Sequence, residues 1–373
     1  MKVAYSKLLE KFSFVLLLPL ILVQRKKSLT IRSILLVEPF QMGDVLSLTP
    51  LIEPLMKKYP AAKISVLTKP GSGAVLEYDS RIHKVYFADF PWSDHGEKKI
   101  TPSRLFGCIH YVISIRKIGF DLGIDTRGDV RSQILLVLAG CRLRVGYLNY
   151  LHSNINLSGH LLTHYLIRSK YLHRYEWNVE LLTCLEIENT AFMPVNFPSF
   201  LPANERLLSL KEMNTIVIHI GGGWIYRRWD ETKWIELINF IKQQKEADIL
   251  VMAGNGEKDV LQRIKSGIEA SEKIHFKVTS LQELISYINQ CSLFIGLDSG
   301  PMNLAVCLNK SVLGLFGPGD STMWRPLNSK GKFIQRTENF PCSPCLQINC
   351  KFPRKNCMNE IEVKDVVEKL FVS

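Results

Sequence analysis

Short apolar runs that alternate with amphipathic segments constrain the fold of this chain more than any other feature. In the first half, "SILLVEPF" from Ser33, "AKISVLTKP" from Ala62 and "FDLGIDTRG" from Phe120 have the pattern of buried strands. Helix-like stretches with one apolar face lie between them, such as "TPSRLFGCIHYVISIRKIG" from Thr101. Strands that alternate with helices predict a parallel sheet that is covered by helices on both faces.

A second series of the same kind begins near Asn214, with "NTIVIHIGGG", "ADILVMAGNG", "SLFIGLDSG" and "KSVLGLFGPGD". Since 373 residues exceed one compact core, we expect two domains. The predicted fold class is α/β, with two Rossmann-like doubly wound domains that face each other across a cleft at the carboxyl ends of their strands. Two prolines in "NFPSFLPANERLL" mark the boundary, so the first domain covers 31–200 and the second 201–373.

The formal net charge of +12 favours a negatively charged partner, such as nucleic acid, an anionic lipid or a phosphorylated substrate. A solubilising basic surface explains the same charge. In the N-terminal segment 1–30, the apolar run from Phe12 to Val23 is shorter than the ~20 residues that span a bilayer as a helix. Basic residues flank it on both sides, which is typical of a segment lying in the interface of an anionic membrane. A helix packed on the protein's own surface is the alternative.

The nine cysteines fall into two groups. Five lie singly in apolar surroundings, and scattered free thiols indicate a reducing compartment, hence the cytoplasm. The other four form a C-x-x-C pair followed by two more cysteines, a pattern that suggests a structural zinc site; they are Cys342, Cys345, Cys350 and Cys357. Disulfides or free thiols are the alternatives.

The turns of the second series carry residues suited to phosphate binding. Gly221 and Gly222 follow a predicted strand, and Arg227 and Arg228 stand just before the next helix. Backbone N–H groups of a glycine turn and nearby arginines bind phosphate, although an ordinary turn with two solvated arginines has the same sequence. Glu257, at the next turn, is placed either to accept hydrogen bonds from ribose hydroxyls or to stabilise the start of its own helix.

The segment "SLFIGLDSGPMNLAVCL" places Asp298, Ser299 and Gly300 between a strand and a helix. A serine nucleophile is not expected here, because the chain is α/β rather than a chymotrypsin-like β-barrel and lacks the G-x-S-x-G motif. A turn that binds a ligand fits this position, and so does a simple helix cap.

Three charged residues stand at turns of the first domain. Asp44 follows Gly43 after the first predicted strand, where a carboxylate can act as a general base toward a hydroxyl or can cap a helix. Arg127 and Arg131 lie beyond a later strand, and they are candidates for binding an anionic acceptor.

The turns "MGDVLSLTP", "RRWDETKW" and "LDSGPMNLAVCLNKSVLGLFGPGD", in this order, resemble glycosyltransferase family 9, whose best-known members are ADP-heptose:lipopolysaccharide heptosyltransferases. The resemblance runs from Ile31 to the C-terminus. It implies the GT-B fold, which is two Rossmann-like domains facing across a cleft. Two positions depart from the family: Asn303 stands where a histidine is common, and Arg227 stands where a lysine is frequent.

The resemblance also implies roles. Asp44 matches the proposed general base, and Arg131 resembles a basic position on the acceptor side, where we also expect Arg127. We expect the nucleotide-sugar donor to contact the turns of the second domain, at Gly221, Gly222, Arg227, Arg228, Glu257, Asp298, Ser299, Gly300 and Asn303.

The expected reaction is the transfer of a sugar, with inversion, to a lipopolysaccharide core or related surface glycan. The expected sugar is heptose, and its expected donor is ADP-heptose. We expect it at the cytoplasmic face of the inner membrane, with no nucleic acid partner. The chain contains no Asp-x-Asp, so arginines rather than a divalent metal are expected to neutralise the leaving group, with no cofactor for catalysis. A transferase for another nucleotide sugar, a non-catalytic sugar-nucleotide-binding membrane protein and a hydrolase based on Ser299 stay open as alternatives.

Overall fold

The computed structural model describes residues 30–93, 100–148, 160–167, 171–188, 215–244, 246–345, 350–352 and 356–371. The chain divides into two compact units, unit 1 (Met1–Met193) and unit 2 (Pro194–Ser373). The domain boundary expected at 200–201 lies outside the described residues, and so do residues 1–29 of the expected membrane segment. Within the described ranges, no helix is both long and apolar enough to cross a bilayer.

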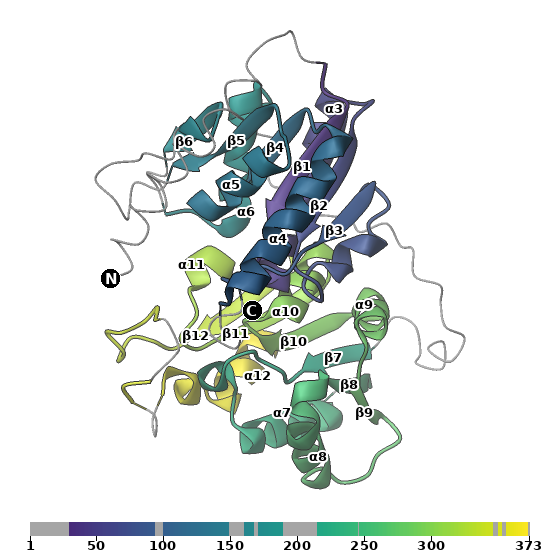
Figure 1. The fold of residues 1–373 in the computed structure, drawn as a ribbon. Helices are drawn as coiled ribbons and strands as arrows, with labels where there is room; N and C mark the ends of the chain where they lie inside the picture. The colour runs from purple at the N-terminus through teal and green to yellow at the C-terminus, as the bar shows by residue number, and fades with distance from the viewer. Residues whose placement is uncertain are drawn as a thin grey trace. The chain divides into compact units, whose positions relative to one another are not determined.

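Unit 1 contains a six-stranded parallel sheet in the order β3-β2-β1-β4-β5-β6 (Figure 1). Its strands are β1 (Ser33–Glu38), β2 (Lys63–Thr68), β3 (Lys84–Phe87), β4 (Leu122–Asp125), β5 (Leu143–Leu148) and β6 (His164–Ile167). Its described α-helices are α2 (Met42–Leu46), α3 (Thr49–Lys58), α4 (Pro102–Ser114), α5 (Val130–Leu138) and α6 (Arg174–Glu180). Short 3₁₀ helices are η1 (Ala74–Tyr78), η2 (Ile115–Ile118) and η4 (Leu181–Leu185).

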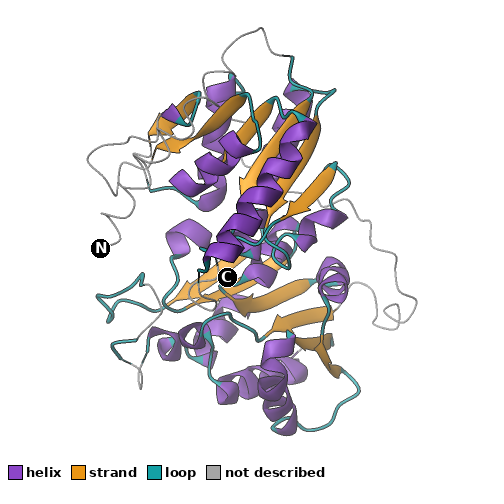
Figure 2. Ribbon diagram, in the orientation of Figure 1, coloured by secondary structure: helices purple, strands orange, loops and turns teal. Residues whose placement is uncertain are grey.

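The central strand β1 shows why the apolar runs become strands. Its residues from Ile34 to Glu38 are all buried, because helices cover the sheet on both faces (Figure 2). Leu35 and Val37 point to one face, where they belong to a core that also contains Val112 of α4 and Leu135 of α5. A strand buried on both faces needs an unbroken apolar run, which is the pattern in the sequence.

Unit 2 contains a second six-stranded parallel sheet in the order β12-β11-β10-β7-β8-β9 (Figure 1). Its strands are β7 (Thr215–His219), β8 (Asp248–Ala253), β9 (Ile274–Val278), β10 (Leu293–Leu297), β11 (Ser311–Phe316) and β12 (Gly331–Gln335). Its described α-helices are α7 (Glu231–Gln244), α8 (Lys258–Ser266), α9 (Leu281–Gln290), α10 (Gly300–Cys307), α11 (Ser321–Trp324) and α12 (Val363–Phe371). Short 3₁₀ helices are η6 (Ile225–Arg227), η7 (Asn255–Glu257) and η8 (Cys357–Glu360).

The two sheets have the same topology. When the strands are numbered within each unit, both follow the order 3-2-1-4-5-6 of dinucleotide-binding domains. The winding therefore reverses between β1 and β4 in unit 1 and between β7 and β10 in unit 2. Ligands of such sheets bind at the carboxyl ends of the strands, at these switch points. The expectation of two Rossmann-like doubly wound units is confirmed, whereas their facing across a cleft stays a prediction.

Several elements were not predicted from the sequence. The strand β5 was missed because Arg144 and Gly146 interrupt its apolar run. Arg144 is nevertheless buried, since its guanidinium donates to the carbonyl oxygens of Leu161 (2.6 Å) and Cys141 (2.8 Å). The edge strands β6, β9 and β12 are partly exposed, so their sequences carry no continuous apolar run. The helices α6, α11 and α12 were missed as well.

The core of unit 2 supplies a test of the packing. Trp234 of α7 is 1% exposed and lies edge-on to Trp229, with ring centroids 4.8 Å apart. Replacing Trp234 with alanine should lower the free energy of unfolding by about 3–5 kcal/mol, because it leaves a large cavity. Urea unfolding followed by circular dichroism measures the change. The matched control is Ile225→Ala, which truncates a side chain that is 69% exposed and should change stability by less than about 0.5 kcal/mol.

Candidate active site

Asp44 lies where the first strand of unit 1 turns into a helix. β1 ends at Glu38, and Gln41 is the N-cap residue of α2. The Oδ2 atom of Asp44 accepts a hydrogen bond from the backbone N–H of Gln41 at 3.3 Å, so the carboxylate caps its own helix. Because α2 directly follows β1, Asp44 stands at the carboxyl edge of the sheet, at the switch point.

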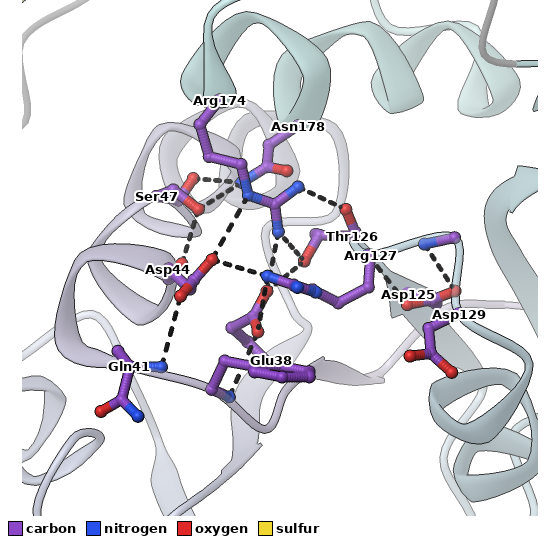
Figure 3. Close-up of polar contacts among 12 residues, drawn as sticks. Glu38, Gln41, Asp44, Ser47, Asp125, Thr126, Arg127, Asp129, Arg174 and Asn178 are labelled. Carbon is purple, nitrogen blue, oxygen red and sulfur yellow. Dashed lines mark hydrogen bonds and ion pairs between the residues drawn. The ribbon is translucent and has the colours of Figure 1, made fainter. Parts of the chain in front are cut away.

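Arg127, on the loop between β4 and α5, contacts Asp44 directly (Figure 3). Its Nη1 atom donates to Asp44 Oδ1 at 2.6 Å, and its guanidinium lies over the ring of Phe40 at 3.9 Å from the centroid. The side chains of Arg127 and Asp44 are 29% and 15% exposed, so a ligand in solvent can reach both. The expected base and one expected acceptor residue therefore belong to the same cluster.

A buried ion pair lies beside this contact (Figure 3). Glu38 Oε2 accepts hydrogen bonds from Arg174 Nη2 at 2.8 Å and from the Thr126 hydroxyl at 3.2 Å. Arg174 Nη1 also donates to the backbone oxygen of Thr126 at 2.7 Å. Burial raises the pKa of Glu38, and the charges of Arg127 and Arg174 offset this only in part.

The loop that carries Arg127 is held by Asp125 at the end of β4. The Asp125 carboxylate accepts hydrogen bonds from the backbone N–H groups of Arg127 (2.9 Å) and Gly128 (3.2 Å). Gly128 has a φ of 69°, a left-handed conformation that favours glycine. Burial raises the pKa of Asp125 to about 7, even though these N–H groups favour its charged form.

Arg131 belongs to a different set of contacts. Its guanidinium pairs with Asp129, the N-cap residue of α5, and lies 5.6 Å from the ring centroid of Trp92. Burial raises the pKa of Asp129, but the hydrogen bonds and charge of Arg131 lower it by more, so the pKa falls on balance. The structure thus joins Arg127 to Asp44 and pairs Arg131 with Asp129.

In unit 2, Arg227 and Asp298 meet at the second switch point. Arg227 ends η6 beyond β7, and Asp298 directly follows β10. Arg227 Nη1 lies 3.2 Å from Asp298 Oδ2 and donates to the Asp298 backbone oxygen at 3.1 Å. Gly319 makes room for this aspartate, because a Cβ atom at position 319 would lie 2.1 Å from Asp298 Oδ2.

The glycine turn after β7 lies against Glu257. A Cβ atom at Gly221 would lie 3.2 Å from the Glu257 carboxyl carbon and 2.8 Å from His219 Cε1. Arg228 Nε donates to the Gly222 oxygen at 3.3 Å, and Arg228 Nη2 lies 3.9 Å from Glu257 Oε1. Burial lowers the pKa of His219 to about 4, so its ring is neutral at pH 7. These expected donor residues form one group within unit 2.

Ser299 occupies the N-cap position of α10. Its hydroxyl donates to the Leu297 oxygen at 3.0 Å and makes no cap hydrogen bond. Asn303, which is buried, donates from Nδ2 to the Ser299 backbone oxygen at 3.0 Å. The N–H groups of Gly300 and Met302, in the first turn of α10, have no carbonyl partner within the helix and are suited to an anion, whereas Pro301 between them has no N–H.

The four C-terminal cysteines form no disulfide bonds. Cys357 is buried and the other three are half-buried; they are Cys342, Cys345 and Cys350. Burial raises the pKa of Cys357 to about 11, and the three other thiols add to the rise. Across the described ranges, no three side chains of metal-ligating type converge closely enough to hold an ion. The structural zinc therefore stays a prediction.

The sequence analysis did not identify the buried residues beside Asp44 and Arg127, which are Glu38, Arg174 and Asn178. Glu38 could have been found, because it is a charged residue at the end of an otherwise apolar strand. Arg174 and Asn178 carry no local signal, since they lie on α6, which was not predicted. Asn178 donates from Nδ2 to the Ser47 oxygen at 2.5 Å and so ties α6 to the turn after α2.

Comparison with known proteins decides the family. A family model described as glycosyltransferase family 9 (heptosyltransferase) matches residues 111–356, which is more than half of the chain. The chain belongs to glycosyltransferase family 9. Among related sequences, the lipopolysaccharide heptosyltransferase 3 of Escherichia coli is 25% identical over 294 residues, covering 76% of this chain and 83% of that protein.

Solved structures of family 9 proteins share the fold. A glycosyl transferase family 9 protein from Veillonella parvula has a TM-score of 0.72 at 18% identity, covering 91% of this chain and 97% of that chain. The E. coli ADP-heptose lps heptosyltransferase II has a TM-score of 0.68 at 17% identity, with the same coverage. The expectations of family 9, of the GT-B type of α/β fold and of a glycosyltransferase are confirmed.

Asp125 predicts a pH dependence of stability. In the unfolded chain it loses its proton near pH 3.8, whereas in the folded chain it does so near pH 7. Between these two pH values the folded state binds more protons than the unfolded state. The free energy of unfolding therefore falls as pH rises through this range, and Asp125 adds no further change above about pH 7. Asp125→Asn should lack this slope. Melting temperatures of both proteins at pH 5 and pH 8 isolate the effect, and an identical pH dependence in the variant would contradict it.

Proposed function

We propose that this chain transfers heptose from ADP-heptose, with inversion, onto a lipopolysaccharide core or a related surface glycan. The observation that carries the proposal is the Asp44 carboxylate, which is reachable from solvent at the switch point of unit 1 and stands beside Arg127. The name of the E. coli relative supports the acceptor class. A structurally similar E. coli heptosyltransferase, solved with ADP-2-deoxy-2-fluoro heptose, supports the donor class.

Asp44 acts as the general base on the acceptor. Its carboxylate accepts the proton of an acceptor hydroxyl while the hydroxyl oxygen attacks the anomeric carbon of the donor sugar. The bond from that carbon to the diphosphate breaks, and its electron pair leaves with the nucleoside diphosphate on the opposite face.

Unit 2 holds the donor in this proposal. Negative charge grows on the leaving diphosphate, and Arg227, Arg228 and the two available N–H groups in the first turn of α10 stabilise it without a divalent metal. Loss of one such contact typically costs about 2.7–4 kcal/mol of transition-state stabilisation. Glu257 accepts hydrogen bonds from the ribose hydroxyls. Asp298, Ser299 and Asn303 form the loop that surrounds the sugar.

A lipid-linked acceptor fits the charge of the chain. A net charge of +12 favours an anionic membrane surface, where a lipopolysaccharide precursor would lie. We therefore place the enzyme on the cytoplasmic face of the inner membrane, as a peripheral protein. Arg131 and Arg127 contribute the positive charge on the acceptor side.

Replacing the proposed base gives the main test. Asp44→Asn should lower the transfer rate by about 100-fold or more, because general-base catalysis contributes about 10²–10⁴. Donor affinity, measured by calorimetry, should be nearly unchanged, because the proposed donor residues lie in unit 2. A near-normal rate with intact donor binding would remove Asp44 from the mechanism. The matched control is Asp89→Asn, which removes a carboxylate of unit 1 that pairs with Arg104.

The donor is identified by a panel of nucleotide sugars. With a heptose-deficient lipopolysaccharide as acceptor, mass spectrometry of the product should show addition of a heptose from ADP-heptose. Transfer from a UDP- or GDP-sugar in its place would favour another transferase of the same fold. Absence of donor consumption with every sugar would favour a non-catalytic binding protein.

We also propose a structural zinc ion bound by Cys342, Cys345, Cys350 and Cys357. Support comes from their spacing and from the backbone N–H of Phe352, which donates to Cys350 Sγ at 3.3 Å, as N–H groups do around metal-bound thiolates. Purified protein should contain one zinc per chain by native mass spectrometry, and Cys345→Ser should lose it. Metal-free protein with an unchanged melting temperature would contradict the site. Cys184→Ser is the matched control, since Cys184 is a half-buried thiol of unit 1.

A further inference from the structure

Arg174 holds a buried hydrogen-bond donor that is not used. Its Nε atom has no hydrogen-bond partner among the described residues, although buried polar groups are almost always paired. Asp44 Oδ1 lies 4.0 Å from this Nε atom (Figure 3). That same oxygen accepts the hydrogen bond of Arg127 Nη1 at 2.6 Å. One carboxylate oxygen therefore lies between two guanidinium groups and contacts only one of them.

The two arginines differ in how firmly they are held. Arg174 is 3% exposed, and its two Nη atoms are fixed by Glu38 and by the backbone oxygen of Thr126. Arg127 is 29% exposed, its guanidinium lies over the ring of Phe40, and its Nη1 atom is 4.0 Å from Glu38 Oε1, which is beyond hydrogen-bond distance. A cation–π contact at an exposed site holds a guanidinium only weakly. Arg127 is therefore the group that can turn toward an incoming anion.

We propose that the Asp44 carboxylate changes its hydrogen-bond partner from Arg127 to Arg174 when an anionic group of the acceptor binds Arg127. This inference rests on the proposed function, because it gives Asp44 its role as base. The movement is small: Asp44 Oδ1 has to approach Arg174 Nε by about 1 Å to reach a normal N–H···O distance. Arg174 thereby acts as a positioning residue that keeps the carboxylate in place after Arg127 has turned away.

The exchange makes the acceptor's own charge a condition for catalysis. Arg127 Nη1 donates to Asp44 Oδ1, so an acceptor anion gains this guanidinium only when Asp44 releases it. After the exchange, the acceptor anion balances Arg127, and Glu38 balances Arg174. A neutral acceptor leaves Asp44 paired with Arg127. The site should thus select acceptors with a phosphate or carboxylate close to the reacting hydroxyl.

The exchange can be tested without turnover, by nuclear magnetic resonance of the full chain labelled with ¹⁵N-arginine. Arg127→Lys and Arg174→Lys assign the two Nε–H signals. Titration with inorganic phosphate should shift the Arg127 signal and move the Arg174 Nε–H proton downfield, because it gains a hydrogen bond. In Asp44→Ala the Arg174 shift should be lost. An Arg174 signal that stays fixed while Arg127 responds to phosphate would overturn the exchange.

Kinetics test its effect on specificity. The acceptors are a heptose-deficient lipopolysaccharide, the same glycolipid after phosphatase treatment, and the same glycolipid with its carboxylates reduced; these arms separate phosphate from carboxylate. Since Arg174→Met leaves Glu38 as a buried unpaired charge, the double variant Arg174→Met with Glu38→Gln removes both charges together. It should lower kcat about tenfold more for the anionic acceptor than for the neutral one, with KM little changed.

The outcomes are distinct. Equal losses on charged and neutral acceptors would make Arg174 a purely structural residue and overturn the proposal. Arg127→Met should abolish the preference for anionic acceptors, and a retained preference would also overturn it. The control Arg104→Met, which breaks an ion pair with Asp89 elsewhere in unit 1, should leave the preference intact. If the wild type transfers no sugar, the proposed function fails, whereas the phosphate titration still decides whether the exchange occurs.

Discussion

The ion pair between Glu38 and Arg174 holds together three segments of unit 1 that surround the proposed base Asp44. Its partners come from β1 and α6, and Arg174 also reaches the backbone of Thr126 beyond β4. Both side chains are almost fully buried, so loss of one partner leaves an uncompensated charge, which typically costs about 3–5 kcal/mol. Because Asp44 and Arg127 stand on the same segments, this buried pair fixes their geometry.

In each unit, an arginine forms an ion pair with an aspartate at the switch point of the sheet. In unit 1 the aspartate follows the first strand and the arginine follows the fourth, as Asp44 and Arg127. In unit 2 the order is reversed, since Arg227 lies beyond β7 and Asp298 follows β10. Any anion that binds either arginine has to compete with a carboxylate already there. Such competition disfavours weakly bound anions and so contributes to specificity.

The sequence was sufficient for the central strands other than β5, because these strands are buried on both faces and have continuous apolar runs, whereas Arg144 and Gly146 interrupt the run of β5. It failed at the edge strands β6, β9 and β12, which are partly exposed. Asp44, Arg227 and Asp298 were predictable, since each stands at a turn near the end of a recognisable strand. The partnership of Glu38 with Arg174 was not, because 136 positions separate them and no local pattern marks a buried ion pair.

Gly319 shows how neighbouring turns of one sheet depend on each other. The space that a Cβ atom would fill at this position is taken by the carboxylate of Asp298. The turn after β11 and the turn after β10 therefore share one small volume, which admits an acidic side chain from one turn only if the other contributes none. Asp298 and Gly319 can change only together, so the shape of the turn after β10 is encoded jointly in two separate stretches of the chain.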